Sequence, residues 1–142
     1  MKQLHTIIMA NENTFSYHRG SFTLSVKGNP ITKGMLVTFD ESQSYVKACG
    51  KAEYPFGIAL RDATPTEGQD AHISIQPLSC TDQSARILVH EAIKAEEPLG
   101  LADNGKAKKL TKEMPFIGIA LTDGTKGSLV ETLTTLPQNI LK

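Results

Sequence analysis

The sequence feature that most constrains the fold is a stretch that occurs twice. Residues 55–62 read Pro-Phe-Gly-Ile-Ala-Leu-Arg-Asp, and residues 115–123 read Pro-Phe-Ile-Gly-Ile-Ala-Leu-Thr-Asp. Both contain Gly-Ile-Ala-Leu, followed by one polar residue and an aspartate. Each copy of an internal repeat is one supersecondary unit, so a repeat decides the fold before other patterns do. The sequence therefore predicts two copies of one module.

The segments that flank the two copies follow the same order. An apolar run that ends in aspartate, a turn and a Lys-containing segment precede each copy, with the runs at residues 31–40 and 93–103. A polar turn and an alternating run follow each copy, with the final runs at residues 71–75 and 128–133. This shared order extends the repeat well beyond four identical residues.

Short segments with β patterns make up the modules. Residues 22–26 alternate apolar and polar side chains, which is the period of a half-buried strand. Residues 56–60 are apolar throughout, which is typical of a strand buried on both faces. Residues 103–105 contain Asn-Gly, the strongest short hairpin signal, because both residues accept the positive φ of a type I′ turn. The pattern predicts an all-β fold.

The chain length suits one domain, since 142 residues can enclose a single core. Two repeats are too few for a solenoid, which needs three or more. We therefore expect residues 21–136 to form one small β-barrel or sandwich from modules at about 22–75 and 87–133. A short tail at residues 137–142 follows.

Residues 1–20 precede the first module and have no counterpart ahead of the second. This N-terminal arm carries an aromatic and cationic cluster of Phe15, Tyr17, His18 and Arg19. One interpretation is a strand that covers a sheet edge. The other is an extended arm that lies on a partner surface and becomes ordered on binding.

Composition excludes several classes of function. Lys plus Arg equals Asp plus Glu at 15 each, so the net charge of zero argues against a nucleic-acid surface. The sequence has no apolar run long enough to span a membrane and no signal-peptide core, so we expect the protein to be made in the cytoplasm and to bind no membrane. Cys49 and Cys80 lack a metal-binding spacing, and we expect free thiols in that reducing compartment.

The sequence offers no recognisable active site. Histidines 5, 18, 72 and 90 lack metal-ligand spacing, and nucleophile-elbow and phosphate-loop motifs are absent. Asp62 and Asp123 could be interpreted as paired catalytic carboxylates, but their equivalent places in the repeat favour the same turn-capping role in each module. We expect no catalytic residues, no metal and no cofactor, and hence a binding or structural module.

The order of these segments resembles that of the capsid decoration (cement) proteins of tailed phages. The resemblance is carried by residues 31–39 with 56–62, and by residues 95–109 with 117–127. In each pair an apolar strand, a hairpin and a Lys-containing strand lead to Gly-Ile-Ala-Leu, an aspartate and a glycine-containing loop. The resemblance covers roughly residues 22–133.

This resemblance implies a structural protein on the virion surface. Such a protein would bind the outer face of an icosahedral head as a homotrimer and would stabilise contacts between major capsid subunits through several modest contacts. The family commonly uses an N-terminal arm, although residues 1–20 match no motif of it. We assign capsid contact to Phe15, Tyr17, His18 and Arg19 because aromatic residues and arginine are enriched at interface anchors.

Two alternatives remain open at this stage. The first is the base of a head fibre or another virion appendage, although the chain lacks the heptads of a long fibre. The second is a small β-barrel that binds a ligand or acts as an enzyme, which would need a pocket with converging polar groups.

Overall fold

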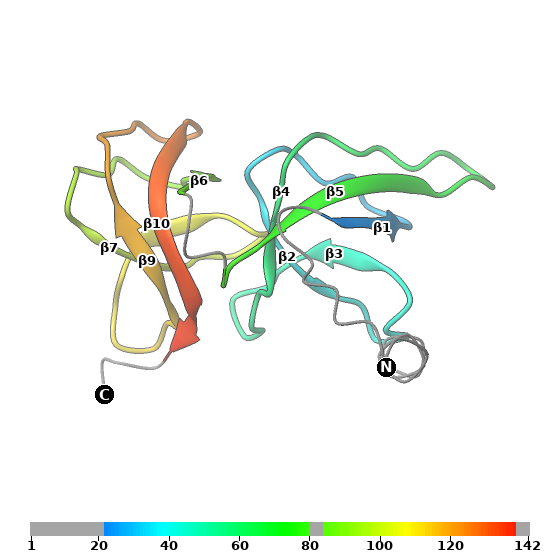
Figure 1. The fold of residues 1–142 in the computed structure, drawn as a ribbon. Coiled ribbons are helices and arrows are strands. Elements are labelled where there is room, and N and C mark those ends of the chain that lie inside the picture. Colours follow the sequence, from blue (N-terminus) through cyan, green and yellow to red (C-terminus); the bar gives the residue numbers. More distant parts are fainter. Residues whose placement is uncertain (1–21, 80–83, 139–142) are drawn as a thin grey trace, which may run out of the picture.

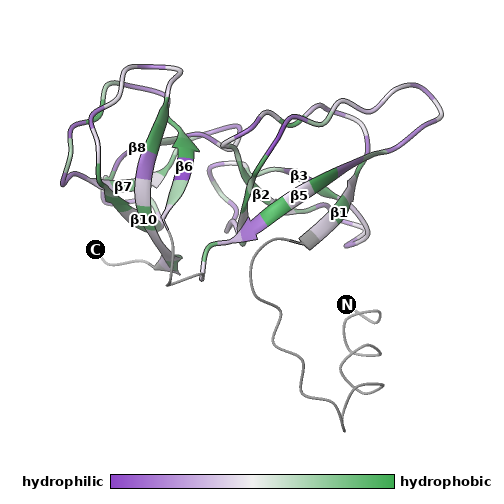
Figure 2. Cartoon of the chain, turned by 45° about the horizontal axis from the view of Figure 1, so that its top comes forward, coloured by the Kyte–Doolittle hydropathy of each residue, from purple (hydrophilic) through white to green (hydrophobic). Residues whose placement is uncertain are grey.

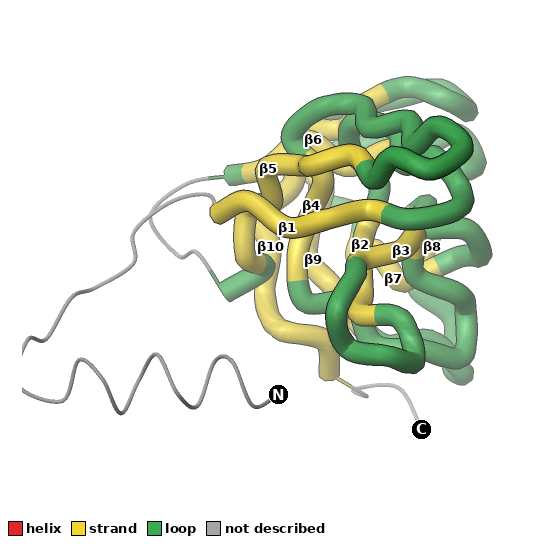
Figure 3. Tube along the Cα trace, turned by 90° about the vertical axis from the view of Figure 1, so that its right-hand side faces the viewer, coloured by secondary structure: helices red, strands yellow, loops and turns green. Residues whose placement is uncertain are grey.

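The computed structural model describes residues 22–79 and 84–138, and all regular structure in these ranges is strand (Figure 3). Phe15, Tyr17, His18, Arg19 and Cys80 lie outside the described residues. No helix in the described ranges is long and apolar enough to cross a membrane. The strands are β1 (Phe22–Val26), β2 (Leu36–Phe39), β3 (Val46–Ala48), β4 (Gly57–Ala59), β5 (Ala71–Pro77), β6 (Ala85–Leu88), β7 (Pro98–Leu101), β8 (Ala107–Lys109), β9 (Phe116–Ala120) and β10 (Leu129–Gln138).

The strands form two units that lie side by side (Figure 1). The first unit is a closed barrel with the order β1-β3-β2-β4-β5, in which β1 and β3 are parallel. The second unit is a five-stranded sheet with the order β6-β10-β9-β7-β8. A single parallel bridge, Val89 with Ala107, joins the β6 end of this sheet to β8. Both units therefore pair their strands in the same order, with β1 to β5 corresponding to β6 to β10, and the all-β prediction is confirmed.

The predicted Asn-Gly hairpin is present between β7 and β8. Asn104 has a φ of 55° and Gly105 a φ of 71°, as a type I′ turn requires. The Lys106 N–H donates to the Asp103 carbonyl at 3.3 Å across the turn, and the Ala102 N–H donates to the Lys106 carbonyl at 2.7 Å beside it.

The last strand is longer than the sequence pattern predicted. The pattern indicated a run that ended at residue 133, whereas β10 continues to Gln138. The extension follows an irregularity in pairing between Thr134 and Gln138, after which Gln138 lies opposite Phe116. Irregular pairing breaks the two-residue alternation of a strand, and for this reason the alternating pattern stopped before the strand did.

The two units share one apolar core. Its buried side chains include Leu36, Cys49, Ile58 and Leu78 from the first unit, which pack with side chains of the second unit, among them Ile87, Leu99, Ile117 and Val130. A second cluster, which includes Val26, Val37, Ile73 and Ile75, fills the barrel of the first unit. In Figure 2 the hydrophobic segments concentrate on the strands, whereas many loop segments are hydrophilic.

Backbone hydrogen bonds join the two units at two glycines, where the backbone of one unit comes close to that of the other. The hairpin between β7 and β8 reaches across to the first unit (Figure 1). There the Leu36 N–H donates to the Gly105 carbonyl and the Gly105 N–H donates to the Cys49 carbonyl, both at 2.7 Å. On the other side, the Leu88 N–H donates to the Gly34 carbonyl at 2.8 Å. Any side chain at Gly34 would overlap Leu129 and lie 3.0 Å from the Leu88 nitrogen.

We predict that Gly34→Ala destabilises the fold by about 1–3 kcal/mol more than Gly28→Ala does. Both glycines have a similar positive φ, 89° and 86°, so the alanine pays the same backbone strain at each. Only Gly34 faces atoms of the other unit, since nothing lies within 4 Å of a Cβ at Gly28. Urea unfolding of the two variants measures the difference, and equal losses would contradict the close contact.

Candidate functional site

The described residues contain no group of three or more His, Cys, Asp and Glu side chains that could hold a metal ion. His72 and His90 are exposed, and His72 alternates with fully buried Ile73, as the strand pattern predicted. The Ser25 Oγ lies 3.3 Å from the His72 Nδ1. His5 and His18 fall outside the described residues.

Asp62 and Asp123 occupy equivalent places and make equivalent contacts. The Lys33 N–H donates to the Asp62 Oδ1 at 2.7 Å, and the Ala95 N–H donates to the Asp123 Oδ1 at 2.8 Å. The predicted equivalence of the two carboxylates is therefore confirmed. Each carboxylate caps a turn other than the one it opens, because the amide that it bonds comes from a turn far back in the chain. Each carboxylate ties that turn to the end of the Gly-Ile-Ala-Leu strand.

Cys49 is a core residue whose environment suppresses thiol reactivity. The side chain has no exposed surface, and burial raises the pKa of the Cys49 thiol to about 12. Since the thiolate is the reactive form, the thiol stays protonated and inert near neutral pH.

We predict that Cys49 in a Cys80→Ser variant resists a thiol reagent while the protein is folded. Labelling at about pH 8 is expected to be slow in buffer and complete in denaturant, since unfolding returns the pKa to its ordinary range. Rapid labelling of the folded variant, with unchanged circular dichroism, would contradict the burial.

The surface feature that stands out is an apolar face on the outside of the second unit. Ile119 on β9 lies between Pro98 on β7 and Leu133 on β10, and the three side chains form one row across the sheet. Leu121, two residues after Ile119, extends this surface just beyond the end of β9. The exposed fractions are 40% for Ile119, 48% for Leu121 and 50% for Leu133, and Pro98 is also exposed. We call Pro98, Ile119, Leu121 and Leu133 the apolar face.

The corresponding row of the first unit is buried. There Leu36, Ile58 and Gln76 lie side by side on β2, β4 and β5, in the pairing that Pro98, Ile119 and Leu133 repeat. Their exposed fractions are only 0%, 1% and 6%, because the second unit covers them. The two copies of Gly-Ile-Ala-Leu thus share a strand position but differ in what lies against them.

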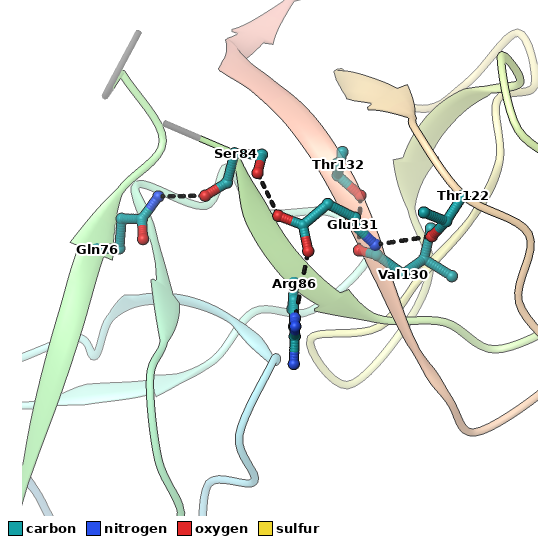
Figure 4. Close-up of polar contacts among 7 residues, drawn as sticks. All are labelled: Gln76, Ser84, Arg86, Thr122, Val130, Glu131 and Thr132. Atoms are coloured by element: carbon teal, nitrogen blue, oxygen red, sulfur yellow. Dashed lines mark hydrogen bonds and ion pairs between the residues drawn. The ribbon is translucent and has the colours of Figure 1, made fainter. Parts of the chain in front are cut away.

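A polar network joins β6 and β10 (Figure 4). It lies beside the apolar face, because the Leu121 N–H donates to the Glu131 carbonyl. The Ser84 hydroxyl and the Arg86 Nε donate to the two carboxylate oxygens of Glu131, the latter at 3.2 Å. The Gln76 side-chain amide donates to the Ser84 carbonyl at 3.4 Å and connects the network to the first unit. The hydrogen bond from Ser84, followed by that from Arg86, lowers the pKa of Glu131.

We predict that Glu131→Gln lowers the free energy of unfolding at about pH 7 by up to about 1 kcal/mol, the range of partly exposed ion pairs. The folded-state pKa of Glu131 lies below its ordinary value of 4.5, so its stabilising effect is present above that pH. It is lost as the pH falls through the lowered folded-state value.

Urea unfolding at about pH 7 and about pH 3 therefore tests the network, because the gap between wild type and Glu131→Gln should close in acid. Glu113→Gln, at an exposed glutamate, is the matched control. A gap that persists unchanged at the lower pH would contradict the network.

Sequence reasoning missed the apolar face. Residues 56–60 were expected to form a strand buried on both faces, and Gly57, Ile58 and Ala59 of β4 are indeed buried. In the second copy Ile119 is exposed. The sequence does contain a signal for this face. Where the first module has Gln76 opposite Ile58, the second module has Leu133 opposite Ile119, which adds an apolar side chain beside the repeated strand.

Comparison with known proteins gives a match of fold. No known family profile matches the chain, and no curated protein sequence matches it. Among solved structures, the N base of the head fibre protein gp8.5 of bacteriophage phi29 is similar, with a TM-score of 0.65. The match covers 83% of this chain and 97% of that one at 14% sequence identity. The chain therefore shares its all-β fold with a protein of a phage head.

Proposed function

We propose that this protein is a structural component of a phage virion that binds the outer surface of the icosahedral head. The observation that carries the proposal is the shared fold with the head fibre base of phage phi29. The order of the repeated segments, which resembles that of capsid decoration proteins, points the same way. Fold alone does not define function, so the proposal depends on these two resemblances together.

The described residues fit a binding role better than a catalytic one. They hold no metal-binding cluster, and the aspartates at the ends of the repeated strands bond backbone amides. The Cys49 thiol is buried in the core, and burial keeps it protonated and unreactive. We therefore propose that the protein is no enzyme and that its partners are other virion proteins, first among them the major capsid protein.

The detailed proposal is that of a cement protein. Homotrimers would sit on the head, contact the major capsid protein through Phe15, Tyr17, His18 and Arg19, and stabilise neighbouring capsid subunits. Several modest contacts to a fixed lattice would give high avidity. We also propose that the two units arose as copies of one ancestral module, because they pair their strands in the same order.

A second candidate is the base of a head fibre, which the phi29 neighbour specifically favours. The two candidates differ in their effect on the head. A cement protein raises the temperature at which heads release their contents, whereas a fibre base binds without that effect. Heating heads with and without saturating protein distinguishes them.

We predict that the purified protein co-sediments with expanded phage heads in a saturable manner, and that removal of residues 1–20 abolishes this binding while the β units stay folded. The substitution Phe15→Ala with Tyr17→Ala and Arg19→Ala should weaken binding by at least about tenfold, the loss expected on truncating interface anchors.

The matched control is Thr14→Ala with Ser16→Ala, which alters the same arm at the two small side chains on either side of Phe15. Failure of the wild-type protein to bind any form of head would overturn the proposed function. Full binding by the truncated protein would overturn the role of the arm alone.

A further inference from the structure

We propose that the apolar face of the second unit is the surface through which copies of this chain associate with one another. Among the described residues, six large hydrophobic side chains are substantially exposed. Ile119, Leu121 and Leu133 belong to the apolar face, whereas Tyr54 and Leu60 lie on the first unit and Leu136 lies near the end of β10. Single exposed hydrophobic residues are common, but a contiguous group of them marks an interaction site.

The first unit shows what kind of element covers this surface. Its corresponding row, Leu36, Ile58 and Gln76, is buried by another β unit of the same topology. In the second unit the row Pro98, Ile119 and Leu133 is more apolar, since a leucine replaces the glutamine, and nothing in the described chain covers it. The precedent within the chain favours a further β unit, which a second copy would supply.

A second copy cannot continue the arrangement head to tail, because the turn that receives the neighbouring unit has changed. Gly34 and Glu96 are equivalent: the N–H of each bonds the alanine carbonyl of the repeated strand, at 2.8 and 2.7 Å, with φ of 89° and 75°. Gly34 lets Leu129 and the backbone of Leu88 approach closely. Glu96 carries an exposed side chain at the corresponding point, so the same approach is blocked.

In a head-to-tail arrangement the first unit of one copy would dock on the apolar face of the next, and its docking surface differs from that of the second unit. The second unit presents the cross-strand pair Leu88 and Leu129 to Gly34. The first unit has the pair Ser25 and His72 in those positions, and these polar side chains lie within hydrogen-bond distance of each other. Seating that pair on the apolar face of another copy would bury polar groups against hydrocarbon, which is unfavourable.

The surface of a second copy that is chemically complementary to the apolar face is that copy's own apolar face. Two or three such faces turned toward one rotation axis would bury the remaining exposed surface of their leucine and isoleucine side chains against each other. The net charge of zero means that copies do not repel one another as whole molecules. Arg86 and Glu131 beside the face supply both signs of charge at its border.

Sedimentation velocity of the purified chain over a concentration series, together with light scattering, tests this inference without any phage head. The wild-type protein is expected to have two or three times the mass of one chain at high micromolar concentration. Leu133→Lys, at the centre of the face, is expected to raise the dissociation constant at least about tenfold, as loss of a central anchor does. Leu121→Lys, at another exposed position of the face, serves if Leu133→Lys lowers the urea midpoint.

The matched control is Leu60→Lys, because Leu60 is the equivalent of Leu121 in the first unit and is 37% exposed. It should leave the association unchanged. A wild-type chain that stays monomeric throughout would overturn the inference, and so would an assembly that the lysine variants leave intact. Head binding is measured separately, so a monomer that decorates heads refutes this association surface alone, and an assembly that binds no head refutes the proposed function alone.

Discussion

The structure depends on a close contact between the backbones of its two β units. Side chains at Gly34 and Gly105 would prevent this contact. At Gly105 the hairpin of the second unit exchanges hydrogen bonds with Leu36 and Cys49, and at Gly34 the first unit accepts one from Leu88. A Cβ at Gly105 would lie 2.7 Å from the Leu36 carbonyl oxygen. Because the backbones meet, Ile58 and Leu78 can pack with Ile87 and Ile117 in a shared core.

One topology thus serves two different surroundings. The strands of each unit pair in the same order, and an aspartate after each repeated strand holds the equivalent turn. The row that contains Ile58 is nevertheless internal, whereas the row that contains Ile119 faces outward. This asymmetry arises because the second unit covers the first, whereas no residue of ranges 22–79 and 84–138 covers the second. It leaves the described part of the chain with an exposed apolar face on the second unit.

Much of the fold could be predicted from the residues. The Asn104-Gly105 turn was predictable because its positive φ angles require those residue types. The equivalence of Asp62 and Asp123 was predictable from the repeat itself. Their bonding partners were not, since Lys33 and Ala95 approach them only after distant segments pair. The last residues of β10 escaped prediction because the pairing irregularity after Thr134 breaks the alternation on which strand assignment depends.

The sequence by itself determined that the chain is all-β, that it is built from two similar units, and that one hairpin has an Asn-Gly turn. These are local properties, which follow from side-chain period, turn chemistry and repetition. Only the tertiary structure decided which copy of Gly-Ile-Ala-Leu lies in the core and which lies at the surface. The strands are nearly identical in sequence, so burial depends on whether another unit packs against them, and that is a property of the assembled fold.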